Sequence, residues 1–117
     1  MSPEDFSSGL MLQVIDQNMK MYRDMYGNGR AERATDPLIK RALTLLHSLQ
    51  PEQQEVLFEI MRQISIDTVS SVLAVLDGVS PLKGAFEEYT LIYDGGAKLN
   101  GDLQSLFLAE DEDRELR

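Results

Sequence analysis

The chain has 117 residues, a net charge of −9 and 43% hydrophobic residues, a composition typical of one soluble globular domain. It contains no cysteine, which excludes disulfides, thiolate nucleophiles and cysteine-ligated metals. The longest unbroken apolar run, residues 72–76, is far shorter than the roughly 20 residues of a membrane span, and the first residues lack the basic and apolar parts of a secretory signal. We therefore expect a cytoplasmic, bacterial-type protein without a membrane part.

The charge is unevenly distributed along the chain. Residues 1–49 hold six acidic and six basic side chains, whereas residues 50–117 hold fourteen acidic and five basic ones. An acidic surface repels nucleic-acid phosphates, so no nucleic-acid partner is expected. It would attract a basic protein, although acidity also serves simply to keep a small protein soluble.

Caps and apolar spacing predict two helices in the first half. The first begins at a Ser2 cap, ends at Gly27 and has an apolar face made of Phe6, Leu10, Val14, Met21 and Met25, widened by Met11 and Ile15. The second begins at Pro37 after a cap from Thr35 or Asp36, and its buried stripe is Leu38, Ala42, Leu45, Leu46 and Leu49.

A third and longest helix is predicted from Pro51 to a stop at Gly78. Its regular stripe is Leu57, Met61, Ile64, Thr68, Val72 and Val75, and its second half adds Ile66, Val69, Leu73 and Leu76. The second half is thus apolar over a wide arc and is expected to have neighbours on two sides. A kink is possible around residues 64–69, which are rich in β-branched side chains.

After the third predicted helix, the spacing of the apolar residues changes to the alternation typical of a β-strand. Tyr89, Leu91 and Tyr93 alternate with other residues, and a turn at Asp94, Gly95 and Gly96 followed by Lys98 and Leu99 predicts a β-hairpin. Asn100 is expected to cap a short last helix, with Asp102 in its first turn. Both features are explained by turn and cap chemistry and need no ligand.

The order of a long helix ending in VLDGV, a short hairpin and the sequence LNGDLQSLFL resembles small uncharacterised bacterial proteins. The resemblance covers roughly residues 60–110. It implies no activity and transfers no functional residues to this chain.

Few chemical motifs are present. A calcium loop starting at Asp94 fails, because Gly96 and Lys98 occupy ligand positions and no acid closes the loop. The single histidine, His47, lacks the companions of a zinc site, so no metal or cofactor is predicted. Asp67 shares a predicted helix face with a stripe of small residues, Ser70, Ser71 and Ala74. We interpret this stripe as a close-packing face, with a general base or metal-binding carboxylate as the less favoured alternative.

Together these patterns predict an α+β, mostly helical fold with three main helices, a short β-hairpin and a short C-terminal helix. Residues 1–110 would form a single domain and residues 111–117 a charged tail. The favoured function is non-enzymatic protein interaction or regulation by a homodimer, with an interface at Asp67, Ser70, Ser71, Ala74, Ile92 and Leu108. The alternatives are an acidic, immunity-type inhibitor of a basic partner and a small carboxylate-based enzyme.

Overall fold

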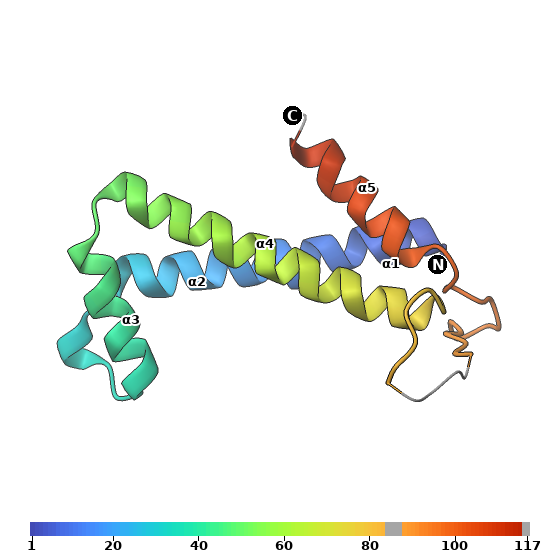
Figure 1. The fold of residues 1–117 in the computed structure, drawn as a ribbon, viewed down its shortest axis with the longest axis horizontal. Coiled ribbons are helices and arrows are strands. Elements are labelled where there is room, and N and C mark those ends of the chain that lie inside the picture. The colour runs from blue at the N-terminus through green and yellow to red at the C-terminus, as the bar shows by residue number, and fades with distance from the viewer. Residues whose placement is uncertain (84–87, 116–117) are drawn as a thin grey trace.

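The computed structural model describes residues 1–83 and 88–115, and the regular structure in these ranges is helical (Figure 1). Its elements in chain order are α1 (Pro3–Leu10), the π-helix η1 (Met11–Asp16), α2 (Gln17–Asn28), the 3₁₀ turn η2 (Ala31–Arg33), α3 (Pro37–Ser48), α4 (Pro51–Leu76) and α5 (Leu103–Glu115). The mostly helical prediction is therefore confirmed.

The helices form an elongated body of 50 × 37 × 24 Å. Figure 1 shows α4 running beside the rod made by α1, η1 and α2, with α3 at one end of the pair. The segment after α4 folds at the other end, and α5 then packs against both α1 and α4.

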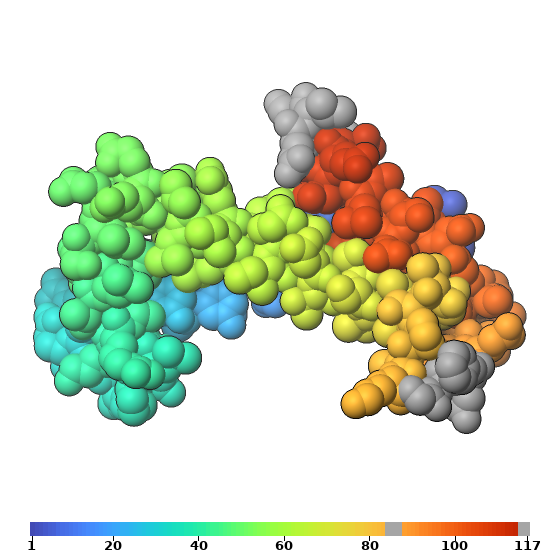
Figure 2. All heavy atoms as spheres, viewed as in Figure 1, coloured from blue at the N-terminus to red at the C-terminus, as the bar shows by residue number. Residues whose placement is uncertain are grey.

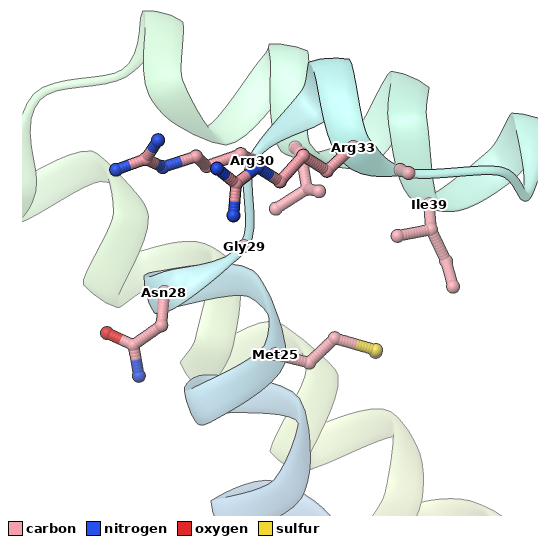
Figure 3. Close-up of a pocket in the computed structure, with 8 residues that line it drawn as sticks. Met25, Asn28, Gly29, Arg30, Arg33 and Ile39 are labelled. Atoms are coloured by element: carbon pink, nitrogen blue, oxygen red, sulfur yellow. The ribbon is translucent and has the colours of Figure 1, made fainter.

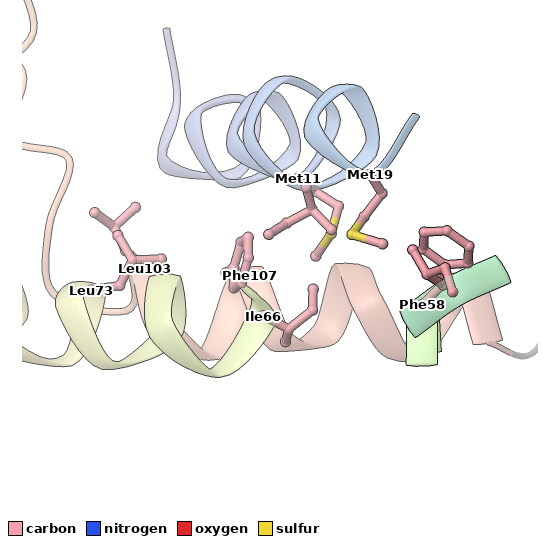
Figure 4. Packing of buried hydrophobic residues seen from close by; sticks show 9 residues of the cluster. Met11, Met19, Phe58, Ile66, Leu73, Leu103 and Phe107 are labelled. Carbon is pink, nitrogen blue, oxygen red and sulfur yellow. The ribbon is translucent and has the colours of Figure 1, made fainter. Parts of the chain in front are cut away.

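The core lies along the line where these helices meet (Figure 4). Its largest fully buried side chains include Met11, Ile15, Ile66, Leu103 and Phe107. Met19 and Phe58 extend the cluster toward the end where α3 lies, and Leu73 extends it toward the segment after α4. Sulfur and aromatic side chains thus fill the space between three helices, a use suited to the flexible methionine side chain.

Local sequence signals set the starts of the first helices. Ser2 and Asp5 form a reciprocal capping box at α1. The Asp36 carboxylate accepts from the Leu38 and Ile39 amides at the start of α3, with Pro37 in the first position.

The end of α4 is a Schellman motif. Gly78 has φ of 78°, its amide donates to the Val75 carbonyl, and the Val79 amide donates to the Ala74 carbonyl at 2.9 Å. The helix is α-helical without interruption from Pro51 to Leu76.

The predicted β-hairpin, and with it the α+β class, is wrong. Within the described ranges no strand forms, and a single antiparallel bridge joins Ile92 to Lys98 around the turn. The reason lies in the side chain of Asn100, which bonds the Leu91 amide and the Tyr89 carbonyl, two backbone groups that a ladder would use. Gly95 and Gly96 still have the positive φ values, 117° and 97°, that make the turn.

The buried face of the first helical rod, made by α1, η1 and α2, differs from the predicted face. The reason is that the π-helix η1 adds one residue to the rod. In a π-helical turn the Gln17 amide bonds the Leu12 carbonyl, five residues back. The inserted residue shifts the buried positions downstream, so Met19 is buried and Met21 is 52% exposed. Met25 is half-buried, and Phe6, Leu10 and Val14 pack at the edge of the core.

Two other predicted features also differ. In α3 the buried residues are Leu43 and Leu46, whereas Leu38 and Leu45 of the predicted stripe are exposed. The segment predicted as a charged tail continues α5 to Glu115, and Asp111 is buried in an ion pair with Arg62 at 2.7 Å.

Candidate functional site

The helix α4 has apolar side chains on two opposite faces. One face carries Phe58, Ile66 and Leu73 into the core. The opposite face, which we call the outer face, carries Val56 and Ile60, 52% and 50% exposed, and Ile64, 59% exposed. It also carries Leu57, Asp67, Thr68, Ser71, Val72 and Val75. Residues 1–83 and 88–115 cover only one of the two faces.

Two adjoining shallow hollows follow the outer face. One, of about 400 Å³, is lined by Leu49, Glu52, Gln53, Val56, Leu57 and Ile60. The next, of about 500 Å³, is lined by Ile64, Asp67, Thr68, Ser71, Val72 and Val75. Together they extend over most of the helix, which Figure 2 shows as the bridge between the two bulkier ends of the molecule.

The polar groups of the outer face already have hydrogen-bond partners within α4. The hydroxyls of Thr68 and Ser71 donate to the carbonyls of Ile64 and Asp67, four residues earlier, at 2.7 and 2.8 Å. The Gln63 amide donates to the Asp67 carboxylate at 2.9 Å. Covering the face would therefore leave these hydroxyls satisfied, which lowers the cost of removing them from water.

The segments before and after α4 carry opposite net charges, whereas the first turns of α4 itself carry three exposed acids, Glu52, Glu55 and Glu59. At its start, residues 29–50 carry four exposed bases, Arg30, Arg33, Lys40 and Arg41, against two exposed acids, Glu32 and Asp36, for a net +2. At its end, residues 77–83 and 88–102 carry four acids, Asp77, Glu88, Asp94 and Asp102, against two bases, Lys83 and Lys98, for a net −2.

The basic end contains a hollow of about 370 Å³ between α2 and α3 (Figure 3). Met25, Ile39 and Leu43 supply apolar lining, and the Arg30 and Arg33 side chains extend side by side. Position 29 requires glycine, because a Cβ there would clash with the Met25 carbonyl oxygen at 2.5 Å.

The acidic end is organised by two side chains. Asn100, 8% exposed, donates to the Leu76 and Tyr89 carbonyls and accepts from the Leu91 amide. The Asp77 carboxylate accepts from the amides of Gly101 and Gln104 at 2.7 and 2.8 Å, at the start of α5. Asp77 therefore caps the start of α5, which was the role predicted for Asn100. Asp102 is exposed just before the helix begins.

A bidentate ion pair links α2 to α4 beside the core. Arg23 donates to both carboxylate oxygens of Glu55 at 2.9 and 2.7 Å, and its guanidinium lies 4.8 Å from the centre of the Phe58 ring. The hydrogen bonds and the charge of Arg23 lower the pKa of Glu55, and the hydrogen bond to Glu55 raises the pKa of Arg23.

The structure separates the residues predicted to form one interface. Asp67 and Ser71 lie on the outer face, whereas Ser70 and Ala74 are buried, and the Ser70 hydroxyl accepts from the Gln104 side chain at 3.1 Å. Ile92 is exposed at the turn, and Leu108 packs half-buried against the core. Sequence reasoning missed Val56 and Ile60 as a surface, although their spacing with Ile64 is a readable signal.

The carboxylates are dispersed. Among the described residues, no group of three or more His, Cys, Asp or Glu side chains gathers where an ion would be held. His47 is exposed on α3. In the same part of the chain, none of the helices combines the length and apolar character that a membrane crossing needs.

Comparisons of the chain with protein-family models, with curated proteins and with solved structures found no match.

Proposed function

We propose that the protein is a non-enzymatic interaction protein that works as a homodimer, with the outer face of α4 at the interface. The observation that supports this is a row of exposed apolar side chains opposite the core, between which the hydroxyls of Thr68 and Ser71 are bonded within the helix. The proposal places the dimer in the bacterial cytoplasm, in keeping with a sequence that contains no cysteine.

The size of the exposed surface agrees with a missing partner. The accessible area is 8286 Å², whereas a compact monomer of 13.2 kDa would expose about 6,400 Å². The excess of about 1,900 Å² exceeds the roughly 800 Å² that each partner buries in a standard interface. The Cα radius of gyration of 17.7 Å is likewise larger than the about 13 Å expected for this length.

The helix alone would supply about half of such an interface. Its 26 residues give a strip about 39 Å long and about 10 Å wide, or about 400 Å² in projection. Further apolar surface lies at both ends: Leu38, Leu45 and Leu49 in or after α3, and Val79 and Leu82 after α4. A partner that covers the outer face and touches both ends therefore reaches the usual size.

A second copy fits this surface better than an unrelated protein does. A two-fold dimer needs only one self-complementary patch. Here the patch is lined mostly by apolar side chains, and its charged lining residues are Glu52 and Asp67. The acidic-inhibitor alternative draws on the net charge of −9, and a monomer that binds a basic protein in a salt-sensitive way would favour it.

The test is light scattering coupled to size exclusion, at micromolar concentration and moderate salt. We expect wild type to have twice the 13.2 kDa chain mass. Ile64→Glu places a charge in the centre of the outer face and should weaken the dimer by about 30-fold or more.

The matched control is Leu12→Glu. Leu12 is 51% exposed, close to the 59% of Ile64, but lies on η1 rather than on the outer face. This variant should remain dimeric, and circular dichroism should show both variants folded. A wild-type mass equal to one chain across the concentration range contradicts the proposal.

A further inference from the structure

We propose that the hollow between α2 and α3 binds a small amphiphilic anion, a molecule with one alkyl chain and a carboxylate or phosphate head group. The hollow has a volume of about 370 Å³, which falls within the roughly 300–1,000 Å³ of small-molecule sites. The proposal does not depend on the homodimer, because this hollow shares no lining residue with the two hollows of the outer face.

Two arginines supply the positive charge of the hollow. The 3₁₀ turn η2 brings their side chains together, because the Arg33 amide donates to the Arg30 carbonyl at 3.0 Å and residues three apart lie above one another in such a turn. Neither guanidinium takes part in an ion pair between described residues. Like charges held side by side repel each other, and an anion bound to both offsets that repulsion.

No carboxylate lines the hollow to repel an anion. The chain has 20 acidic and 11 basic residues, and each of the two hollows of the outer face has an acidic lining residue, Glu52 or Asp67. Of the acids nearest in sequence, Asp24 and Glu32 do not line this hollow. The Asp36 carboxylate already accepts from two backbone amides at the start of α3.

The other side of the hollow is apolar. In Figure 3 the two guanidinium groups and the Asn28 amide lie on one side, and the Met25 and Ile39 side chains lie on the other. Leu43, which is 2% exposed, packs closely at Gly29, where a Cβ would lie 3.0 Å from its Cδ2 atom. The close contact of α2 with α3 therefore forms the hollow before any ligand arrives.

This division of polar and apolar lining fits a ligand with a head and a tail. A guanidinium donates two parallel hydrogen bonds to a carboxylate or a phosphate, which fixes the head group. An alkyl chain laid against Met25 and Ile39 gains from leaving water. A simple anion uses only the first contribution and an uncharged alcohol only the second, so neither should bind as well as the amphiphile.

Calorimetric titration of the full chain tests the proposal with four probes. Octanoate and octyl phosphate, each below its micelle concentration, carry both parts of the ligand, whereas acetate lacks the chain and 1-octanol lacks the charge. We expect both amphiphiles to bind about tenfold or more tightly than acetate or 1-octanol. Amide shifts in two-dimensional NMR spectra should change most within residues 25–43.

A matched pair of double variants locates the charge that binds. Arg30→Gln with Arg33→Gln should weaken octanoate binding about tenfold or more. Lys40→Gln with Arg41→Gln removes the same charge from exposed positions of α3 that do not line the hollow. The second pair should bind as wild type does, and circular dichroism should show both variants folded.

The remaining outcomes are equally decisive. Equal loss of affinity in the two double variants would assign the attraction to the general charge of this region and overturn the site. Octanol binding as tightly as octanoate, or acetate doing so, would overturn the amphiphilic ligand. Shift changes confined to the outer face of α4, or no binding by either amphiphile at millimolar concentration, would also overturn the proposal. Binding by one amphiphile alone supports it and identifies the head group.

Discussion

Asn100 is the residue that holds the turn region against the helices. It is buried, and its single amide group bonds a carbonyl at the end of α4 and two backbone groups of residues 89–91. Asparagine is suited to this position because its side chain both donates and accepts. One side chain thereby replaces hydrogen bonds that a second strand would have supplied.

Asn100→Ala should therefore destabilise the protein strongly. The substitution leaves two carbonyls and one amide without their partner in a buried place, which should lower the free energy of unfolding by about 2 kcal/mol or more. Urea unfolding followed by circular dichroism measures this value. Asn18→Ala, at an exposed position of α2, is the control and should change stability little. Equal stability of Asn100→Ala and wild type would contradict the role assigned to Asn100.

At the level of elements, helix starts could be predicted where the capping residue lies close in sequence to the groups it bonds. They could not be predicted where the capping residue is distant in sequence. Ser2, Asp36 and Pro37 act within three residues of the groups they serve, and their helix starts are where the sequence places them. Asp77 bonds amides 24 and 27 residues away, at Gly101 and Gln104, and no spacing rule connects them. Only tertiary packing brings these groups together.

The same distinction explains the helix faces. The sequence shows that the second half of α4 is apolar over a wide arc and predicts neighbours on two sides, but among the described residues only the side with Ile66 and Leu73 has them. Which face enters the core depends on the partners, here Met11, Ile15 and Phe107. The π-helical η1 was also not readable, because the extra residue is accommodated by packing and leaves no mark in composition.

The link between α2 and α4 predicts a pH dependence. Arg23 lowers the pKa of Glu55 in the folded chain below its ordinary value of 4.5. The stabilisation is therefore fully present above pH 4.5 and is lost as the pH falls through the lower, folded value. Glu55→Gln should melt below wild type at pH 7, and the two should converge in acid.

Thermal melts from pH 7 to pH 3 measure this convergence. Glu32→Gln serves as the control, since Glu32 is exposed and makes no ion pair among the described residues. Its melting temperature should track wild type throughout. A constant gap between Glu55→Gln and wild type over the whole range would show that the Glu55 charge is not what joins the helices.

At the scale of the whole molecule, the fold is a strip of helices rather than a sphere. The core follows the contact of α4 with its neighbours, and the part of the chain that the structure describes leaves the opposite side of α4 exposed. A chain of this shape buries less apolar surface than a compact one, and so gains less stability from its own core. Association through the outer face would supply the missing burial.

The melting temperature should consequently rise with protein concentration. When a folded dimer unfolds to two chains, each tenfold increase in concentration favours the folded state by about 1.4 kcal/mol per dimer. With the usual enthalpy per residue, this shifts the melting temperature by about 3 °C. Scanning calorimetry from 5 to 500 μM covers two such steps, so the shift of about 6 °C expected for wild type is well above error. Ile64→Glu should melt below wild type at each concentration, because its dimer is about 30-fold weaker, whereas Leu12→Glu should follow wild type. A wild-type melting temperature independent of concentration would mean that the core in one chain alone sets the stability, and that the outer face of α4 contributes nothing to it.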